Sequence, residues 1–266
     1  MRAPFRHMGG KAKLVKYLLP LIPEHVCYVE PFGGAASLLF AKEPSQIEAI
    51  NDVNGDLVNF MRVLQRKPWE LVARLMWQPY SRAERAASER MGGGGSVARA
   101  ARWYFLKQGS FGGKGPGNGL AVGMTLHARR HPEDGSQNPA RSFARHVADL
   151  AGRAWRLREV VIESLDALEV VRRYDRPTTF FYVDPPYVNG TGAWPEAEHR
   201  RLAEALSGIK GKALVNYYDA PLVRELYGGW RVEAIANPAV NVEGRRGPRR
   251  RDSLLAIRNY PLWGEE

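Results

Sequence analysis

The chain has 266 residues, a hydrophobic content of 44% and a formal net charge of +11, which suits a globular protein with a sizeable core. Its one cysteine, Cys27, excludes an internal disulfide and fits a reducing, cytoplasmic environment. The short run YLLPLIP at 17–23 is broken by prolines and no small-residue cleavage site follows it, so we expect neither a signal peptide nor a membrane span.

Strand-like and helix-like segments alternate through much of the chain. The runs HVCYVE at 25–30 and QIEAIND at 46–52 predict strands, and helical patterns follow them at 35–42 and 55–67. Further strands are expected at 159–165, 178–183, 212–219 and 253–260, with helices at 196–209 and 220–228. This alternation predicts an α/β fold in which helices flank a mainly parallel sheet.

The positive charge is concentrated in two places. Between Arg99 and Arg158 the chain has 11 Lys and Arg residues against three acidic ones, a local balance of +8. A second basic run, EGRRGPRRRD, occupies 243–252. Such fields favour a polyanion, of which nucleic acid is the first candidate, and a basic surface without a ligand is the alternative.

Residues 68–158 interrupt the regular alternation. The segment is glycine-rich in MGGGGS and GSFGGKGPGNG, and SVARAARWYFLKQ at 96–108 predicts a helix with aromatic residues among basic ones. Glycine runs alone could be linkers, but rings beside Arg and Lys offer stacking faces next to phosphate-binding groups. We therefore predict a core domain formed by 1–67 and 159–266, interrupted by a mostly helical and loop domain at 68–158 that binds nucleic acid.

The segment YVEPFGGAASLLF at 28–40 predicts a ligand site. Gly33 and Gly34 stand between a strand and a helix, where a ligand can approach the backbone and the helix N-terminus. The fingerprint G-x-G-x-x-G is absent, which disfavours a dinucleotide. Asp52 follows about 19 residues after Gly33, at the end of the next strand, where it can accept hydrogen bonds from ribose hydroxyls. An ordinary turn explains the glycines alone, but with Asp52 they favour an adenosine ligand without a diphosphate, such as S-adenosylmethionine.

A second candidate site is TTFFYVDPPY at 178–187. Its first six residues predict a buried strand, and two prolines then end the strand because each lacks a backbone N–H. Asp184 and Tyr187 would therefore leave the carboxyl edge of the sheet, which is where ligands bind in open α/β folds. A simple strand terminator is the alternative.

Four motifs appear in order: MGGK at 8–11, VEPFGGAAS at 29–37, NDVNGDL at 51–57 and DPPY at 184–187. Together they resemble the adenine-specific DNA methyltransferases of the DNA adenine methylase group. The likeness covers residues 5–190 and continues more loosely to LLAIRNY at 254–260. It implies a Rossmann-like sheet that binds S-adenosylmethionine, an inserted target-recognition domain, and methyl transfer to N6 of a flipped adenine in duplex DNA.

The resemblance also implies roles for the residues that match. The catalytic motif would be Asp184, Pro185, Pro186 and Tyr187. Lys11 and residues 30–37 would line the methionine end of the cofactor, and ESLD at 163–166 would lie beside its adenine. His7 stands where such enzymes often have an aromatic residue that covers the cofactor. The implied cofactor contacts are His7, Lys11, Glu30, Pro31, Phe32, Gly33, Gly34, Asp52, Asp166 and Asp184.

The target sequence does not follow from the resemblance, because the insertion lacks the pattern of the GATC-specific members. The residues expected to contact DNA are Lys107, Gln108, Lys114, Arg129 and Arg130. No metal site is expected, since the six histidines and one cysteine show no ligand spacing. We expect a monomer whose partners are double-stranded DNA and, in the cell, a cognate restriction endonuclease, and we expect no membrane contact. An RNA adenine-N6 enzyme, a cytosine-N4 enzyme and a non-catalytic basic DNA-binding module are the alternatives.

Overall fold

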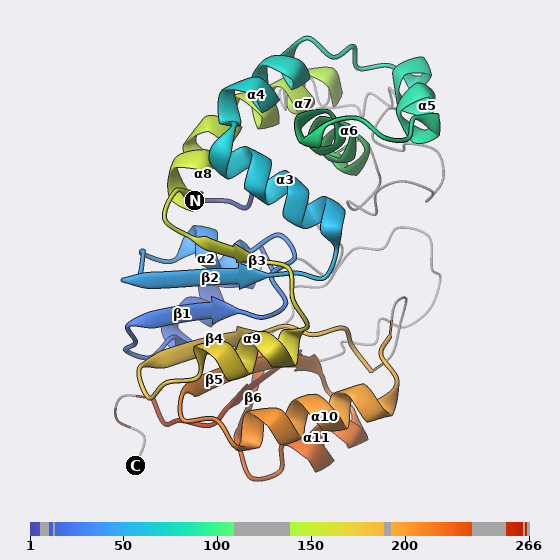
Figure 1. Ribbon diagram of the computed structural model, residues 1–266. Coiled ribbons are helices and arrows are strands. Elements are labelled where there is room, and N and C mark those ends of the chain that lie inside the picture. The colour runs from blue at the N-terminus through green and yellow to red at the C-terminus, as the bar shows by residue number, and fades with distance from the viewer. Residues whose placement is uncertain are drawn as a thin grey trace, which may run out of the picture. The chain divides into compact units, whose positions relative to one another are not determined.

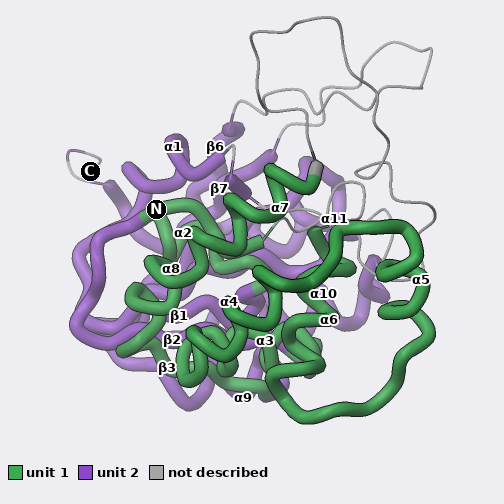
Figure 2. Tube along the Cα trace, turned by 90° about the horizontal axis from the view of Figure 1, so that it is seen from above, with its two compact units in different colours: residues 1–10, 34–41, 53–164 green, residues 11–33, 42–52, 165–266 purple. Residues whose placement is uncertain are grey.

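The structure is a computed structural model that describes residues 1–5, 11–12, 14–108, 139–188, 193–235, 254–262 and 264. The chain forms two compact units (Figure 2). Unit 1 contains residues 1–10, 34–41 and 53–164, and unit 2 contains residues 11–33, 42–52 and 165–266. The predicted catalytic and target-recognition domains divide the chain by function, and this division stays a prediction. No helix among the described residues is long and apolar enough to cross a membrane.

Seven strands form one mixed sheet in the order β3-β2-β1-β4-β5-β7-β6 (Figure 1). The strands are β1 (Cys27–Glu30), β2 (Ile47–Asn51), β3 (Val161–Glu163), β4 (Thr179–Val183), β5 (Lys212–Tyr218), β6 (Arg231–Ile235) and β7 (Leu254–Arg258). β1 pairs in parallel with β2 and with β4, and β4 pairs in parallel with β5. β7 runs antiparallel to both β5 and β6. The predicted α/β sheet is confirmed, with an antiparallel pair at one edge.

The sequence pattern does not predict β6. Four of its five residues are exposed, so RVEAI has no buried apolar run to mark it as a strand. In contrast, all five residues of β4 are buried, as are all five of β7. Strands that are buried on both faces have nearly continuous apolar sequences, which is why these two could be predicted.

The helical elements of unit 2 are α1 (Val15–Leu18), the 3₁₀ helix η1 (Leu19–Leu21), α9 (Ala167–Tyr174), α10 (Glu196–Ser207) and α11 (Pro221–Leu226). One apolar core joins α9, α10 and α11 to the sheet. Alternate residues of β4 and β5, among them Phe181, Val183, Val215 and Tyr217, contribute to this core. These helices thus pack on one face of the parallel strands, and the carboxyl ends of the strands form one edge of the sheet.

Unit 1 is mainly helical. Its helices are α2 (Ser37–Ala41), α3 (Gly55–Arg66), α4 (Pro68–Met76), α5 (Arg82–Arg90), α6 (Ser96–Gln108), α7 (Pro139–Ala148) and α8 (Leu150–Leu157). α6 has the predicted bounds. We expected its aromatic residues to face solvent, but they are buried. Phe60 of α3 stacks on Tyr104 with 5.1 Å between ring centroids, and Trp103 packs edge-to-face on Phe5 at 4.9 Å. These rings belong to the core of unit 1. Burial of their large apolar surface is favourable even though charged residues stand beside them in the sequence.

Candidate active site

A compact polar cluster lies where β4 ends in unit 2. Lys11 Nζ lies 2.6 Å from both Asp184 Oδ1 and Asp184 Oδ2, and it also donates a hydrogen bond to the Tyr187 hydroxyl. That hydroxyl donates to Asp184 Oδ1 at 3.2 Å. The Lys11 side chain is 6% exposed and that of Asp184 is 20% exposed, so the ion pair is shielded yet reachable. The fold thus brings together two residues 173 positions apart.

The phenol of Tyr187 is neutral and its ring is tightly placed. Burial, and next the negative charge of Asp184, raise the pKa of Tyr187 far above its ordinary value. The ring packs edge-to-face against Tyr218 with 4.7 Å between centroids, and Lys11 Nζ lies 5.1 Å from its centroid. Tyr187 therefore presents an ordered aromatic face beside a carboxylate.

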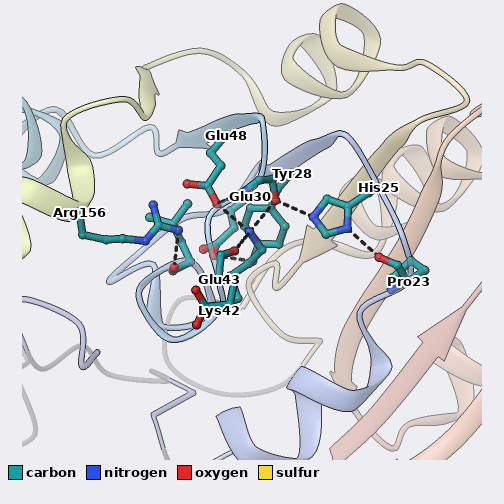
Figure 3. A network of polar contacts seen from close by, with 10 residues as sticks. Pro23, His25, Tyr28, Glu30, Lys42, Glu43, Glu48 and Arg156 are labelled. Atoms are coloured by element: carbon teal, nitrogen blue, oxygen red, sulfur yellow. Dashed lines mark hydrogen bonds and ion pairs between the residues drawn. The ribbon is translucent and has the colours of Figure 1, made fainter.

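The end of β1 carries Glu30, one of the predicted cofactor residues, which is only 1% exposed. The Tyr28 hydroxyl donates a hydrogen bond of 2.7 Å to Glu30 Oε1, within a larger polar network (Figure 3). Lys42 Nζ lies 4.5 Å from the centroid of the Tyr28 ring and pairs with Glu48 Oε1 at 2.6 Å. The Glu30 carboxylate is thus oriented by groups that are themselves anchored.

The turn after β1 needs glycine at Gly33. Its N–H donates to the Asn51 carbonyl at 2.6 Å, and a Cβ at Gly33 would lie 3.0 Å from that same oxygen. Any other residue would therefore have to move the chain away from β2. Gly34 adopts a φ of 49°, in the left-handed region that favours glycine. Phe32 packs edge-to-face on Trp194 with 5.3 Å between ring centroids.

Asp52 directly follows β2 and is half-buried. Because β1 pairs with β2 and β4 in parallel, Asp52, Phe32 and Asp184 all lie at the carboxyl edge of these strands.

Asp166 has a structural role that its sequence context did not predict. Its side chain accepts hydrogen bonds from Leu168 N and Glu169 N and caps α9. The cofactor contacts of Asp52 and Asp166 stay predictions.

These residues fit S-adenosylmethionine. The carboxylates of Asp52 and Asp184 at one strand edge suit ribose hydroxyls and a positively charged sulfonium group, and Phe32 and Tyr187 add apolar faces. Gly33 lets this turn lie close against the end of β2, next to Asp52. In the described part of the chain, no group of three or more His, Cys, Asp or Glu side chains could hold a metal ion.

The structure does not describe all of the predicted site residues. His7, Lys114, Arg129, Arg130 and the basic run at 243–252 lie outside the described residues. Lys107 is 8% exposed, with its Nζ 5.6 Å from the Trp103 ring centroid. Gln108 Nε2 donates to the Tyr104 hydroxyl at 3.2 Å. Lys107 and Gln108 thus have contacts within unit 1, and their role in binding DNA stays a prediction.

Asn51 and Tyr218 are site residues that the sequence analysis missed. Asn51 binds the segments on both sides of β2, and Tyr218 packs on Tyr187. Both stand at the ends of predicted strands, and Asn51 is next to Asp52 in NDVNGDL. This position in the sequence could have identified them as site residues.

Comparisons with known proteins identify the family of the chain. The sequence profile of the D12 class N6 adenine-specific DNA methyltransferase family matches residues 7–89 and 126–242. A protein of Escherichia phage P1 named DNA N-6-adenine-methyltransferase is 27% identical over 272 residues, which cover 91% of this chain and 34% of that protein. The type II methyltransferase M1.LlaDCHI of Lactococcus lactis subsp. cremoris is 24% identical over 274 residues, 95% of this chain and 93% of that protein.

The chain spans about a third of the phage protein and nearly the whole length of the Lactococcus protein. The profile match covers more than half of the chain and includes both DPPY and the glycine turn. The chain belongs to the family of D12 class N6 adenine-specific DNA methyltransferases.

Proposed function

We propose that this protein transfers a methyl group to N6 of an adenine that has been flipped out of duplex DNA, and that Asp184 is its main catalytic residue. D12 methyltransferases use S-adenosylmethionine, which supplies a methyl group bound to a sulfonium. The observation that carries the proposal is the cluster of Lys11, Asp184 and Tyr187 where β4 ends.

Asp184 and Pro185 supply the acceptors that adenine requires. The exocyclic amine of adenine is a poor nucleophile because its lone pair is delocalised into the ring. The Asp184 carboxylate and the Pro185 carbonyl would accept hydrogen bonds from the two amine protons, which favours a tetrahedral nitrogen with an available lone pair. The carboxylate also stabilises the positive charge that grows on this nitrogen during transfer.

Lys11 orients the carboxylate of Asp184. It contacts both carboxylate oxygens, and each of these oxygens retains acceptor capacity for an amine proton. The ion pair fixes the plane of the carboxylate without a ligand, so little reorganisation is needed when a base arrives. Lys11 is also our candidate for a contact with the methionine end of the cofactor.

Tyr187 would stack on the target base. An adenine inside a duplex cannot reach the strand edge, so the base must leave the helix and find a stacking partner in the protein. The neutral phenol of Tyr187, fixed by Tyr218 and by Asp184, is a suitable partner.

We expect the protein to act on DNA as a monomer. We also expect it to be in the cytoplasm, in agreement with its single cysteine.

The cofactor would be held along the strand edge. Asp52 would accept hydrogen bonds from the ribose hydroxyls, and residues 30–33 would line the methionine end. Asp166 and the turn before α9 would lie beside the adenine. The order of the strands supports this arrangement, because β2, β1 and β4 end at neighbouring positions of one edge.

The test measures transfer of labelled methyl groups from S-adenosylmethionine to three substrates: a random-sequence DNA duplex pool, the separated strands, and RNA. Digestion to nucleosides should show label in N6-methyldeoxyadenosine from the duplex. Label in N4-methyldeoxycytidine, or in RNA alone, would contradict the proposal. Label from the separated strands but not from the duplex would contradict the duplex requirement.

Substitution of the acceptor tests the assignment of Asp184. Asp184→Ala should lower kcat by about 100- to 1000-fold or more, with nearly unchanged Kd for cofactor and DNA, because the acceptor acts mainly in the transition state. Glu204→Ala on the exposed side of α10 is the matched control and should behave as the wild type. Equal losses of cofactor binding and turnover in Asp184→Ala would show that the site is wrongly assigned.

A further inference from the structure

The side chain of Asn51 joins segments that are far apart in the sequence. Asn51 is the last residue of β2 and is 2% exposed. Its Nδ2 donates hydrogen bonds to the Pro31 carbonyl at 2.9 Å and the Leu165 carbonyl at 3.0 Å. Its Oδ1 accepts a hydrogen bond of 2.8 Å from Leu165 N. Both amide protons and the amide oxygen are thus bound to backbone, so the side chain has one orientation.

Each bonded segment carries part of the candidate cofactor site. Pro31 belongs to the turn that contains Phe32 and Gly33, and Leu165 immediately precedes Asp166. The backbone of Asn51 adds a further link, because its carbonyl accepts from Gly33 N at 2.6 Å. Asp52 is the next residue in the chain. Asn51 therefore ties together the glycine turn, the ribose-binding candidate and the turn before α9.

The geometry requires an amide at this position. Two carbonyl oxygens need donors and one backbone N–H needs an acceptor, and only a planar amide supplies all three within the reach of a short side chain. Aspartate has the same shape but no donor, so it would place a carboxylate against two carbonyl oxygens. Glutamine is longer by a methylene group that a buried site does not accommodate.

We propose that Asn51 is a positioning residue for the adenosine half of the cofactor site. It acts through its neighbours: it fixes the glycine turn and the Leu165 turn relative to Asp52, and so sets the space between the ribose and adenine contacts. This inference rests on the proposed function, in which these segments bind S-adenosylmethionine. The network contains neither Asp184 nor Tyr187, so the acceptor geometry for the target base does not depend on it directly.

The inference predicts a selective loss. In Asn51→Asp, the Kd for S-adenosylmethionine should rise by about 10- to 100-fold. Loss of residues that orient the ligand-binding groups has an effect of this size at metal sites, and Asn51 orients its neighbours in the same indirect way. The Kd for S-adenosylhomocysteine should rise by a similar factor, since the two ligands share their adenosine. At saturating cofactor, kcat and the KM for DNA should remain close to the wild-type values, and a purely structural role would not separate these parameters in this way.

Asn259→Asp is the control, at an exposed asparagine whose amide also binds backbone groups. Asn259 Nδ2 donates to the Gly211 carbonyl at 3.1 Å, and its Oδ1 accepts from Ala213 N at 2.8 Å. This amide also joins separate backbone segments, but it does so where β5 begins, away from the carboxyl strand ends. The control should lower the melting temperature without changing the Kd for cofactor.

The outcomes separate the two claims. If Asn51→Asp lowers the melting temperature as Asn259→Asp does and binds cofactor as the wild type does, the positioning role is overturned. If Asn51→Asp does not fold, Asn51→Ser, which keeps one donor and one acceptor, decides by the same comparison of cofactor Kd. A wild-type protein that methylates no adenine would overturn the proposed function, whereas the Kd values of the variants would still decide the role of Asn51.

Discussion

The residues at the end of β4 hold the carboxylate of Asp184, which we propose as the catalytic acceptor. Lys11 binds both oxygens of Asp184, and Tyr187 adds a hydrogen bond to one of them. The carboxylate is therefore oriented before any substrate arrives, while part of its surface stays exposed. At the neighbouring strand ends, Asp52 and the Gly33 turn lie on the side where we place the cofactor. We therefore predict that loss of Asp184 acts mainly on turnover, whereas loss of Asp52 acts mainly on cofactor binding.

Asp52→Ala tests this separation. A pair of charge-assisted hydrogen bonds to ribose contributes about 1.5–3 kcal/mol, so the Kd for S-adenosylmethionine should rise roughly tenfold to a hundredfold. Isothermal calorimetry measures this Kd directly. Asp56→Ala, which removes an exposed carboxylate paired with Arg99, is the control and should leave the Kd unchanged. A Kd for Asp52→Ala equal to that of the control would exclude Asp52 from the site.

At the scale of elements, a partly buried polar network supports the start of β1. His25, which precedes β1, has its Nδ1 2.7 Å from the Pro23 carbonyl (Figure 3). Its Nε2 lies 2.7 Å from Ser45 Oγ. A carbonyl can only accept, so Nδ1 carries the proton and Nε2 accepts from the serine hydroxyl. Burial, and to a lesser extent the charge of Lys42, lower the pKa of His25, although the Pro23 carbonyl opposes the shift.

This lowered pKa predicts a pH-dependent contribution to stability. The unfolded chain, with an ordinary histidine pKa of about 6.5, binds a proton before the folded protein does as the pH falls. The contribution of His25 is therefore complete above about pH 6.5 and declines as the pH falls through 6.5 towards the lower pKa of the folded state. Urea unfolding of the wild type and His25→Gln between pH 7.5 and 5 measures it.

The difference in free energy of unfolding between these two proteins should shrink towards pH 5. Other titrating groups contribute nearly equally to both proteins, so they cancel in the difference. A difference that stays constant across this range would contradict a lowered pKa of His25.

At the scale of the whole molecule, the charge of +11 matches a DNA substrate. Phosphate contacts orient a protein on DNA, whereas base contacts in the grooves read the sequence. We place base reading in the insertion at 68–158 and assign only phosphate contacts to the basic run at 243–252. Most of the residues concerned, including Lys114, Arg129 and Arg130, lie outside the described part of the chain.

Alanine substitutions across 107–130 should include at least one that relaxes the preference for one position of the target site. An arginine bidentate to guanine contributes about 1–3 kcal/mol of discrimination. Substitutions across 245–251 should weaken binding to all DNA equally and reduce the salt slope by about one per contact. Methylation profiling of each variant on a random-sequence duplex pool distinguishes the two effects. Altered preference confined to 245–251 would show that the recognition segment is wrongly placed.

The sequence by itself determined the features that depend on local pattern. Apolar runs predicted β1, β2, β3, β4, β5 and β7, and the sequence pattern also predicted the helices α3 and α6, because side-chain periodicity follows directly from backbone geometry. The position of Asp184 at a strand end followed from the two prolines, and that of Asp52 from the end of an apolar run.

Only the tertiary structure decided which of these features meet. The pairing of Lys11 with Asp184 spans 173 positions, and the bonds from Asn51 to Leu165 span 114, so they depend on the order of the strands and not on any local pattern. The aromatic residues of α6 illustrate the same limit: the charges beside them indicated a surface, but the packing of α3 and Phe5 placed them in a core. Burial is a property of the assembled fold, because it depends on which segments pack together after the chain has folded back on itself.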